Sequence, residues 1–227
     1  MAKIAIIAAL DVEIEGFIKD FNAQSVNDYI YKGSYCGHDV YLTLCGVGKV
    51  NAAICTQRII DYADPDYIIN SGIAGLISKK LKMLDTVISD KLFYHDFSPA
   101  ELLETFFPYR SYFEADKKLI KLAQEACERF ALENEGFSYL TGTVVSGDMF
   151  VKSSEYKKRL EKDFDAACTE MEGASVAHTA FANKKPVLVL RTISDTADDN
   201  AEEYYDELFS VAAKRAIYIV EDIIANI

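Results

Sequence analysis

The sequence predicts an α/β fold: a single domain over residues 1–227, with a central mixed, mostly parallel sheet covered by helices on both faces. Apolar strands alternate along the chain with segments of helical spacing, which is typical of such sheets. Hydrophobic residues make up 50% of the 227, enough for one large core. Only 4 prolines occur, and no Gly/Ser-rich linker or internal repeat marks a domain boundary.

The first part of the chain predicts a strand, a helix and a hairpin. Residues 3–9 are apolar and β-branched, as in a buried strand. The next segment repeats apolar residues at helical spacing, at Ile14, Phe17, Ile18 and Phe21. Residues 29–35 and 40–45 flank the turn sequence Cys-Gly-His-Asp and therefore predict a hairpin.

The middle of the chain predicts a second helix and two strands. The helix follows the Gly-Val-Gly sequence at 46–48 and ends near residue 63, because the Asp-Pro-Asp sequence at 64–66 stops it. Residues 67–70 are expected to form a short buried strand and residues 85–94 a longer one. Residues 98–114 hold several aromatic residues and two prolines without a regular period, so no element is predicted there.

The last part predicts three helices and two strands. Residues 116–132 and 202–226 each have an amphipathic helical pattern, and a third helix is expected from about 172 to 182. The predicted strands are 140–145 and 186–190. Acidic residues stand at the start of the final helix, where the helix dipole favours them.

The composition favours a small-molecule ligand in a reducing compartment. Lys and Arg number 24 against 36 Asp and Glu, and the net charge of −12 disfavours nucleic acid and anionic membranes as partners. The 5 cysteines form no C-x-x-C pair and only 3 histidines occur, so neither disulfides nor a metal site is predicted. The apolar N-terminus is too short for a signal peptide and acids follow it at once. We therefore expect a cytoplasmic protein without metal or cofactor.

Polar residues follow several of the predicted strands. Ligands of parallel α/β sheets bind at the carboxyl ends of the strands. These ends supply Ala8-Ala9 followed by Glu13, then Asn70-Ser71-Gly72, then residues 146–150, then Ser194-Asp195. Acids, small polar residues and one aromatic side chain are therefore expected to meet at one edge of the sheet.

Seven short motifs carry a resemblance to one known family. They are IIAALDVE at 6–13, GVGKV at 46–50, NSGIAG at 70–75, VISD at 87–90, VSGDMF at 145–150, EMEGA at 170–174 and RTISD at 191–195. In this order they cover nearly the whole chain, which resembles the 5′-methylthioadenosine/S-adenosylhomocysteine nucleosidases of the purine nucleoside phosphorylase superfamily. The resemblance implies a nucleoside phosphorylase-like fold and hydrolysis of the N-glycosidic bond of 5′-modified adenosines.

The resemblance also implies two catalytic acids. Cleavage of an N-glycosidic bond develops an oxocarbenium ion on the ribose and negative charge on the leaving base, so one acid can protonate the base while another activates water. The family match assigns the first role to Asp195, which delivers a proton to adenine N7, and the second to Glu13. A general acid at neutral pH needs a raised pKa, which burial beside the base can provide.

The remaining site residues follow from the same resemblance. Glu172 is expected to accept hydrogen bonds from the ribose hydroxyls, with Met171 against the sugar and Arg191 bonded to a carboxylate or to the water. Phe150 is expected to stack on adenine, whose edge the main chain of Val151 contacts. A backbone role is expected for Ile73 and Ala74 in a glycine-containing loop. Further predicted contacts are Val47, Glu170, Ser194 and Tyr205.

Two other functions compete with hydrolysis. A purine nucleoside phosphorylase needs an anion site, normally built with arginine, but none of the 6 arginines lies in 8–16 or 70–76, and Glu13 would repel phosphate. A non-catalytic nucleoside-binding protein is disfavoured because Asp195, Glu13 and Glu172 are all present.

Residues 98–114 depart from the family pattern. Relatives carry a Tyr-Gly-Gln-type motif in this segment and lend its aromatic side chains across a dimer interface to cover the 5′ substituent. This chain lacks the motif but is aromatic there, so we expect a homodimer while the 5′ substituent stays open. Methylthioadenosine, S-adenosylhomocysteine, 5′-deoxyadenosine and a futalosine-type nucleoside all remain candidates.

Overall fold

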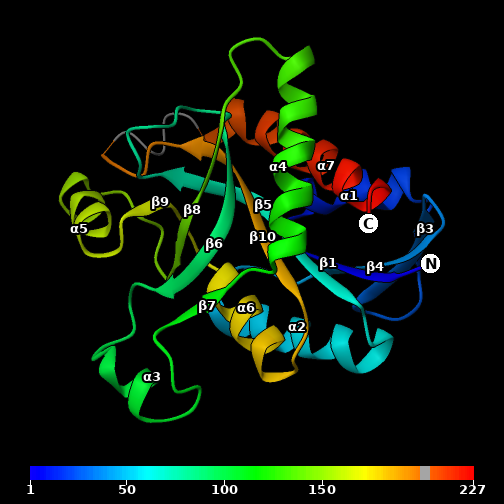
Figure 1. Ribbon diagram of the computed structural model, residues 1–227, viewed down its shortest axis with the longest axis horizontal. Coiled ribbons are helices and arrows are strands. Elements are labelled where there is room, and N and C mark those ends of the chain that lie inside the picture. The colour runs from blue at the N-terminus through cyan, green and yellow to red at the C-terminus, as the bar shows by residue number, and fades with distance from the viewer. Residues whose placement is uncertain (200–204) are drawn as a thin grey trace.

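A mixed sheet runs through the centre of the molecule, with its strands in the order β10-β6-β8-β9-β5-β1-β4-β3-β2 (Figure 1). The strands are β1 (Lys3–Ala8), β2 (Gln24–Ser25), β3 (Ile30–Tyr35), β4 (His38–Leu44), β5 (Tyr67–Leu76), β6 (Thr86–Tyr94), β7 (Tyr112–Glu114), β8 (Tyr139–Ser146), β9 (Ala166–Glu170) and β10 (Val187–Asp195). This computed structural model describes residues 1–199 and 205–227, and only the backbone of 205–207. The predicted α/β class is confirmed.

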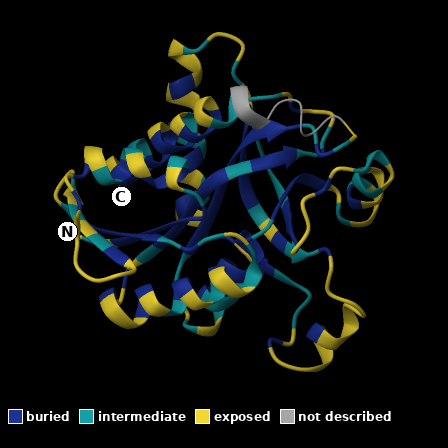
Figure 2. Cartoon of the chain, turned by 180° about the vertical axis from the view of Figure 1, so that it is seen from behind, coloured by how far each residue is buried: buried dark blue, intermediate teal, exposed yellow. Residues whose placement is uncertain are grey.

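Helices cover both faces of the sheet. They are α1 (Asp11–Asp20), α2 (Lys49–Ala63), α3 (Glu101–Thr105), α4 (Lys117–Glu133), α5 (Ser154–Phe164), α6 (Gly173–Ala182) and α7 (Tyr205–Ala225). One side is covered by α1, α4 and α7 and the other by α2 and α6, while α3 projects from the body (Figure 1). Figure 2 shows the buried sheet between helices whose outer surfaces are exposed.

The position of β1 in the sheet explains why its sequence does not alternate between apolar and polar residues. Ile4, Ile6 and Ala8 pack in the core under α1, α4 and α7. Ala5 and Ile7 belong to the opposite core, under α2 and α6. Because the strand pairs in parallel with both β4 and β5, residues 4–8 all face protein, and only Lys3 at its start is exposed.

Five strands of the sheet close into a ring. Strand β10 pairs in parallel with β5 and antiparallel with β6, and the ring continues through β8 and β9 back to β5. The closure brings the ends of three strands together, because Gly75 of β5 is the pairing partner of both Asp195 and Thr169. A sheet edge rich in acids is thereby folded into a concave surface.

The structure differs from the sequence prediction in the length of two strands and in several elements that were not predicted, among them α3 and β7 within residues 98–114. The sequence predicted a strand at 67–70 followed by a loop at Ser71–Gly75, whereas β5 continues to Leu76 because these residues pair with β10. Strand β10 likewise runs five residues beyond the predicted end, to Asp195. Helix α5 and strand β9 were not predicted at all. The described helices include none that is both long and apolar enough to span a membrane.

Candidate active site

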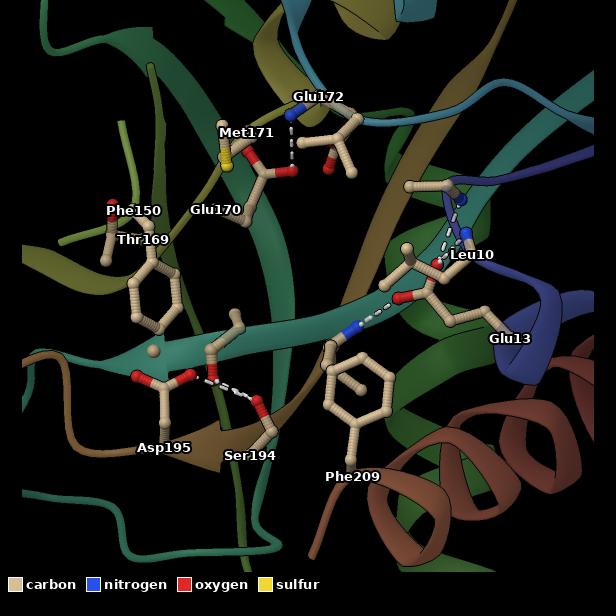
Figure 3. Close-up of a pocket in the computed structure, with 15 residues that line it drawn as sticks. Leu10, Glu13, Phe150, Thr169, Glu170, Met171, Glu172, Ser194, Asp195 and Phe209 are labelled. Atoms are coloured by element: carbon tan, nitrogen blue, oxygen red, sulfur yellow. Dashed lines mark hydrogen bonds between the residues drawn. The ribbon is translucent and has the colours of Figure 1, made fainter. Parts of the chain in front are cut away.

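A cavity of about 520 Å³ opens where the strand ends meet (Figure 3). Ten of the residues predicted from the sequence line it: Glu13, Val47, Ile73, Ala74, Phe150, Glu170, Met171, Glu172, Ser194 and Asp195. Val151 lines a small recess that shares Phe150, Thr169 and Asp195 with the cavity. Arg191 lies behind the wall, and the side chain of Tyr205 lies outside the described residues.

Glu13 is held at the start of α1 by backbone N–H groups. Its Oε2 accepts hydrogen bonds from the N–H groups of Ala9 (2.9 Å) and Leu10 (3.0 Å), as a glutamate in the first turn of a helix can. Its Oε1 accepts the N–H of Ile73 at 3.0 Å, which ties the helix to β5. Burial raises the pKa of Glu13, although the charge of Arg191 opposes the shift.

Asp195 ends β10 and is 3% exposed. Its Oδ1 accepts the N–H of Ala197 at 2.9 Å, and its Oδ2 lies 3.1 Å from the Ser194 hydroxyl, which donates to it. Burial raises the pKa of Asp195, and these two hydrogen bonds offset part of the shift. The neutral, proton-carrying form is therefore favoured relative to an exposed aspartate.

Glu172 shares a buried guanidinium with Glu170. Arg191 Nη2 lies 2.5 Å from Glu170 Oε2 and 3.9 Å from Glu172 Oε2. The Oε1 of Glu172 accepts the N–H of Gly48 at 2.9 Å. Burial and then the Glu170 charge raise the pKa of Glu172 to about 7, although Arg191 opposes them.

Glu170 has its carboxylate fully engaged by protein donors. Besides Arg191, it accepts the N–H groups of Glu172 (3.0 Å) and Gly173 (2.7 Å) and the hydroxyl of Ser146. It thus occupies the N-terminus of α6, where anions are stabilised. Glu170 fixes the turn that presents Met171 and Glu172 to the cavity, while Oε2 of Glu172 has no hydrogen bond to another of the described residues.

Apolar side chains form the rest of the wall. Figure 3 shows Phe150 and Asp195 on one side of the cavity, Glu13 and Phe209 on the other, and Met171 beside Glu170. A flat ligand placed between Phe150 and the strand ends would have an acid at its edge. An aromatic wall with few convergent polar groups is typical of a pocket for a small heterocycle.

The sequence analysis did not name five of the lining residues as site residues: Ala9, Leu10, Gly75, Thr169 and Phe209. Phe209 stands four residues after Tyr205, one helical turn further along the same face of α7, and this spacing was the available signal. Thr169 could not be found because β9 itself was not predicted. Its hydroxyl is buried without a hydrogen-bond partner among the described residues.

Fold and cavity together define a nucleoside-cleaving enzyme: three buried carboxyl groups of raised pKa, those of Glu13, Glu172 and Asp195, face one aromatic pocket at the strand ends. The comparison with known families agrees, since the model of the phosphorylase superfamily matches residues 3–225. The chain belongs to this superfamily and, within it, to the 5′-methylthioadenosine/S-adenosylhomocysteine nucleosidases, as the following relatives show. It is an N-glycosyl hydrolase.

A nucleosidase of this name from Haemophilus influenzae (strain PittEE) is 36% identical over 98% of both chains. The crystal structure of the Neisseria meningitidis nucleosidase in complex with methylthio-immucillin-A superimposes with a TM-score of 0.92 at 33% identity, over 100% of both chains. The native structure of the Helicobacter pylori futalosine hydrolase also matches, with a TM-score of 0.90 and 28% identity over 100% of this chain and 98% of that one.

Proposed function

We propose that this nucleosidase hydrolyses the N-glycosidic bond of 5′-modified adenosines, such as methylthioadenosine and S-adenosylhomocysteine, and releases adenine and a 5′-substituted ribose. The observation that carries the proposal is the placement of Asp195 and Glu13. Both are buried, both have a raised pKa, and they face the same cavity from opposite sides (Figure 3). One acid can therefore serve the leaving base and the other the incoming water.

Asp195 is the general acid in this proposal. When the bond between C1′ and N9 breaks, its electron pair moves into the purine, and a proton on N7 neutralises the developing charge. Asp195 lies beside the ring of Phe150, on which the base would stack (Figure 3). Two hydrogen bonds, donated by the Ser194 hydroxyl and by the Ala197 N–H, fix the direction of the Asp195 carboxyl group.

Glu13 orients a water molecule and accepts its proton as the water attacks C1′. Its three backbone donors hold the carboxylate in place, and the pKa raised by burial makes it a stronger base than an exposed glutamate. Glu172 accepts hydrogen bonds from the ribose hydroxyls, and Met171 packs against the sugar. Arg191 acts behind them by holding Glu170.

Water is favoured over phosphate as the nucleophile. Among the described residues that line the cavity, none is Lys or Arg, while Glu13, Glu170, Glu172 and Asp195 are acids. Phosphate would meet repulsion there and no guanidinium fork to bind it. The carboxylate of Glu13 instead matches the hydrogen-bonding needs of a neutral water molecule.

The lining favours an apolar 5′ substituent. Leu10, Val47, Met171 and Phe209 all contribute apolar surface to the cavity. A thioether such as the methylthio group is compatible with this surface, and the Neisseria relative binds a methylthio compound. We therefore expect methylthioadenosine to be a better substrate than a futalosine-type nucleoside.

We further propose that the enzyme is a cytoplasmic homodimer. Phe106, Phe107 and Tyr109 are 62%, 61% and 70% exposed on the segment that relatives use at their dimer interface. Such a patch is costly on a monomer. All 5 cysteines carry free thiols, as expected in a reducing compartment. Analytical ultracentrifugation that finds a fully active monomer of 25.4 kDa would reject the dimer.

The test is release of free adenine, followed by chromatography over a panel of 5′-modified adenosines in phosphate-free buffer with EDTA. We expect release from methylthioadenosine and S-adenosylhomocysteine at undiminished rate in EDTA, because the carboxyl groups carry both proton transfers. Strict dependence on added phosphate, with ribose 1-phosphate as product, would reject hydrolysis. A parallel preparation of Asp195→Asn controls for contaminating nucleosidase.

A further inference from the structure

Lys49 occupies a position that its charge makes unfavourable. It is the first residue of α2, where the helix dipole opposes a cation. Two aspartates from other elements compensate: the Lys49 ammonium lies 2.6 and 2.7 Å from the two oxygens of Asp96 and 3.7 Å from Asp148 Oδ2. The side chain of Lys49 is only 22% exposed, and that of Asp96 is 21% exposed. The group is therefore more than a single solvated ion pair.

These charges join two loops of the active site. Residues 46–48, the first loop, carry Val47 of the cavity wall and the Gly48 N–H that binds Glu172. Residues 147–150, the second loop, carry Phe150. The Lys49 N–H donates to Asp148 Oδ1 at 2.8 Å, and the Asp148 N–H donates to Asp96 Oδ2 at 2.8 Å. Hydrogen bonds and charge thus connect both loops through Lys49 and Asp96.

The packing around the two loops leaves no room for a side chain at Gly48 or Gly147. A Cβ on Gly48 would lie 3.0 Å from Asp148 Oδ1, and a Cβ on Gly147 would lie 2.3 Å from the His95 ring. The hydrogen bond from Lys49 and the one from the Asp148 N–H lower the pKa of Asp96, although its partial burial acts in the opposite direction. Asp96 therefore stays charged, and without Lys49 it would face Asp148 with no cation between them.

We infer that Lys49 is a positioning residue for substrate binding, which holds the loop of Phe150 against the loop of Gly48, whose N–H binds Glu172. The inference rests on the proposed function, because it assumes that Phe150 and Glu172 contact the nucleoside. Asp195 belongs to β10 and Glu13 to α1, and neither contacts Lys49. Loss of Lys49 therefore weakens binding in ground state and transition state alike, which raises KM and leaves kcat nearly unchanged.

The experiment compares Lys49→Met, Lys49→Arg and Asp148→Asn with wild type in adenine release. We expect Lys49→Met to raise KM by about tenfold with kcat within about threefold, and Lys49→Arg to restore KM to within about threefold. Asp148→Asn keeps the acceptor for the Lys49 N–H and should raise KM by only about threefold. Lys121→Met is the matched control, because Lys121 pairs with Glu125 on the exposed side of α4.

Three results would overturn the inference: an unchanged KM in Lys49→Met, an equal effect in Lys121→Met, or a fall in kcat at constant KM. Amide hydrogen exchange of residues 146–151 supplies a readout that needs no turnover, and it should quicken in Lys49→Met by about fivefold or more. A wild type that releases no adenine rejects the proposed function alone. An active wild type with unchanged exchange and KM in Lys49→Met rejects only the role of Lys49.

Discussion

Arg191 and Glu170 form an ion pair closed to solvent, with Nη2 and Oε2 2.5 Å apart and each side chain 2% exposed. Arg191 also donates to Asn70 Oδ1 at 2.6 Å, so the guanidinium connects β10 to β5 as well as to β9. The ion pair can influence the active site without contacting the substrate. The pair fixes the turn on which Met171 and Glu172 stand.

Removing the guanidinium should destabilise the whole domain. Arg191→Leu leaves the Glu170 carboxylate buried without its cation, and loss of one partner of a buried pair costs about 3–5 kcal/mol. The measurement is urea unfolding. Arg129→Leu is the control, because Arg129 forms a partly exposed pair with Asp222 and such pairs contribute about 1 kcal/mol or less. An equal loss of unfolding free energy in the two variants would contradict the prediction that the buried ion pair contributes more to stability than the exposed one.

Asp195→Asn should separate chemistry from binding. Asparagine keeps the size and most hydrogen bonds of the side chain but has no proton to give to N7, so kcat should fall by about 10²–10⁴. Nucleoside affinity, measured by calorimetry, should change little, since Phe150 and Glu172 are untouched. Near-normal turnover would show that another group is the general acid.

Glu13→Gln and Glu172→Ala should differ from each other. Glutamine at 13 cannot take the proton of water, so turnover should fall by about 10²–10⁴ while nucleoside affinity persists. Alanine at 172 removes the ribose anchor, so affinity and turnover should both weaken. Calorimetry and adenine release on the same preparations distinguish the two patterns, and identical profiles would argue against separate roles.

Gly72→Ala tests the fit of Glu13 against β5. A Cβ at this position would lie 2.6 Å from Glu13 Oε1 and 3.2 Å from Arg191 Nη1, so the catalytic carboxylate must move. We expect loss of turnover with destabilisation of about 1–3 kcal/mol. Gly142→Ala on β8 is the control, since its Cβ would come no closer than 3.4 Å to a neighbour. An active Gly72→Ala enzyme would show that the position of Glu13 is not critical.

Glu221 should make stability depend on pH. Burial, and then the nearby Asp20, raise the pKa of Glu221 from its ordinary 4.5 to about 7 in the folded protein. The folded state therefore binds more protons than the unfolded state between these values, and stability falls as pH rises through this window. Glu221→Gln should match wild type near pH 4, below the unfolded pKa, and exceed it at pH 8 in urea unfolding. The exposed Glu133→Gln should leave the wild-type slope unchanged.

The sequence predicted the class of fold from local signals, whereas it predicted ten cavity residues through the resemblance of its motifs to a known family. Apolar runs identified most strands, and the motifs at strand ends identified Glu13, Phe150, Glu172 and Asp195. Strand β9 was not predicted because its sequence, Ala-Ala-Cys-Thr-Glu, lacks β-branched apolar residues. Pairing with β8 and β5 stabilises this strand instead. Helix α5 is strongly polar with one buried residue, Leu160, so its pattern was weak.

Closure of the five-strand ring has a consequence for the behaviour of the protein at high concentration. The ring strands β5, β6, β8, β9 and β10 each have partners on both sides. On the far side of the sheet, the edge strand β2 covers β3 with two residues only, and Lys32 of β3 pairs with Gln24 of that edge strand. Short, charged edges are poor templates for the addition of a strand from another molecule. The ring that joins Asp195 to Gly75 thus also leaves the sheet with only short strands at its edges, β2 and β7, at which fibrillar self-association could begin.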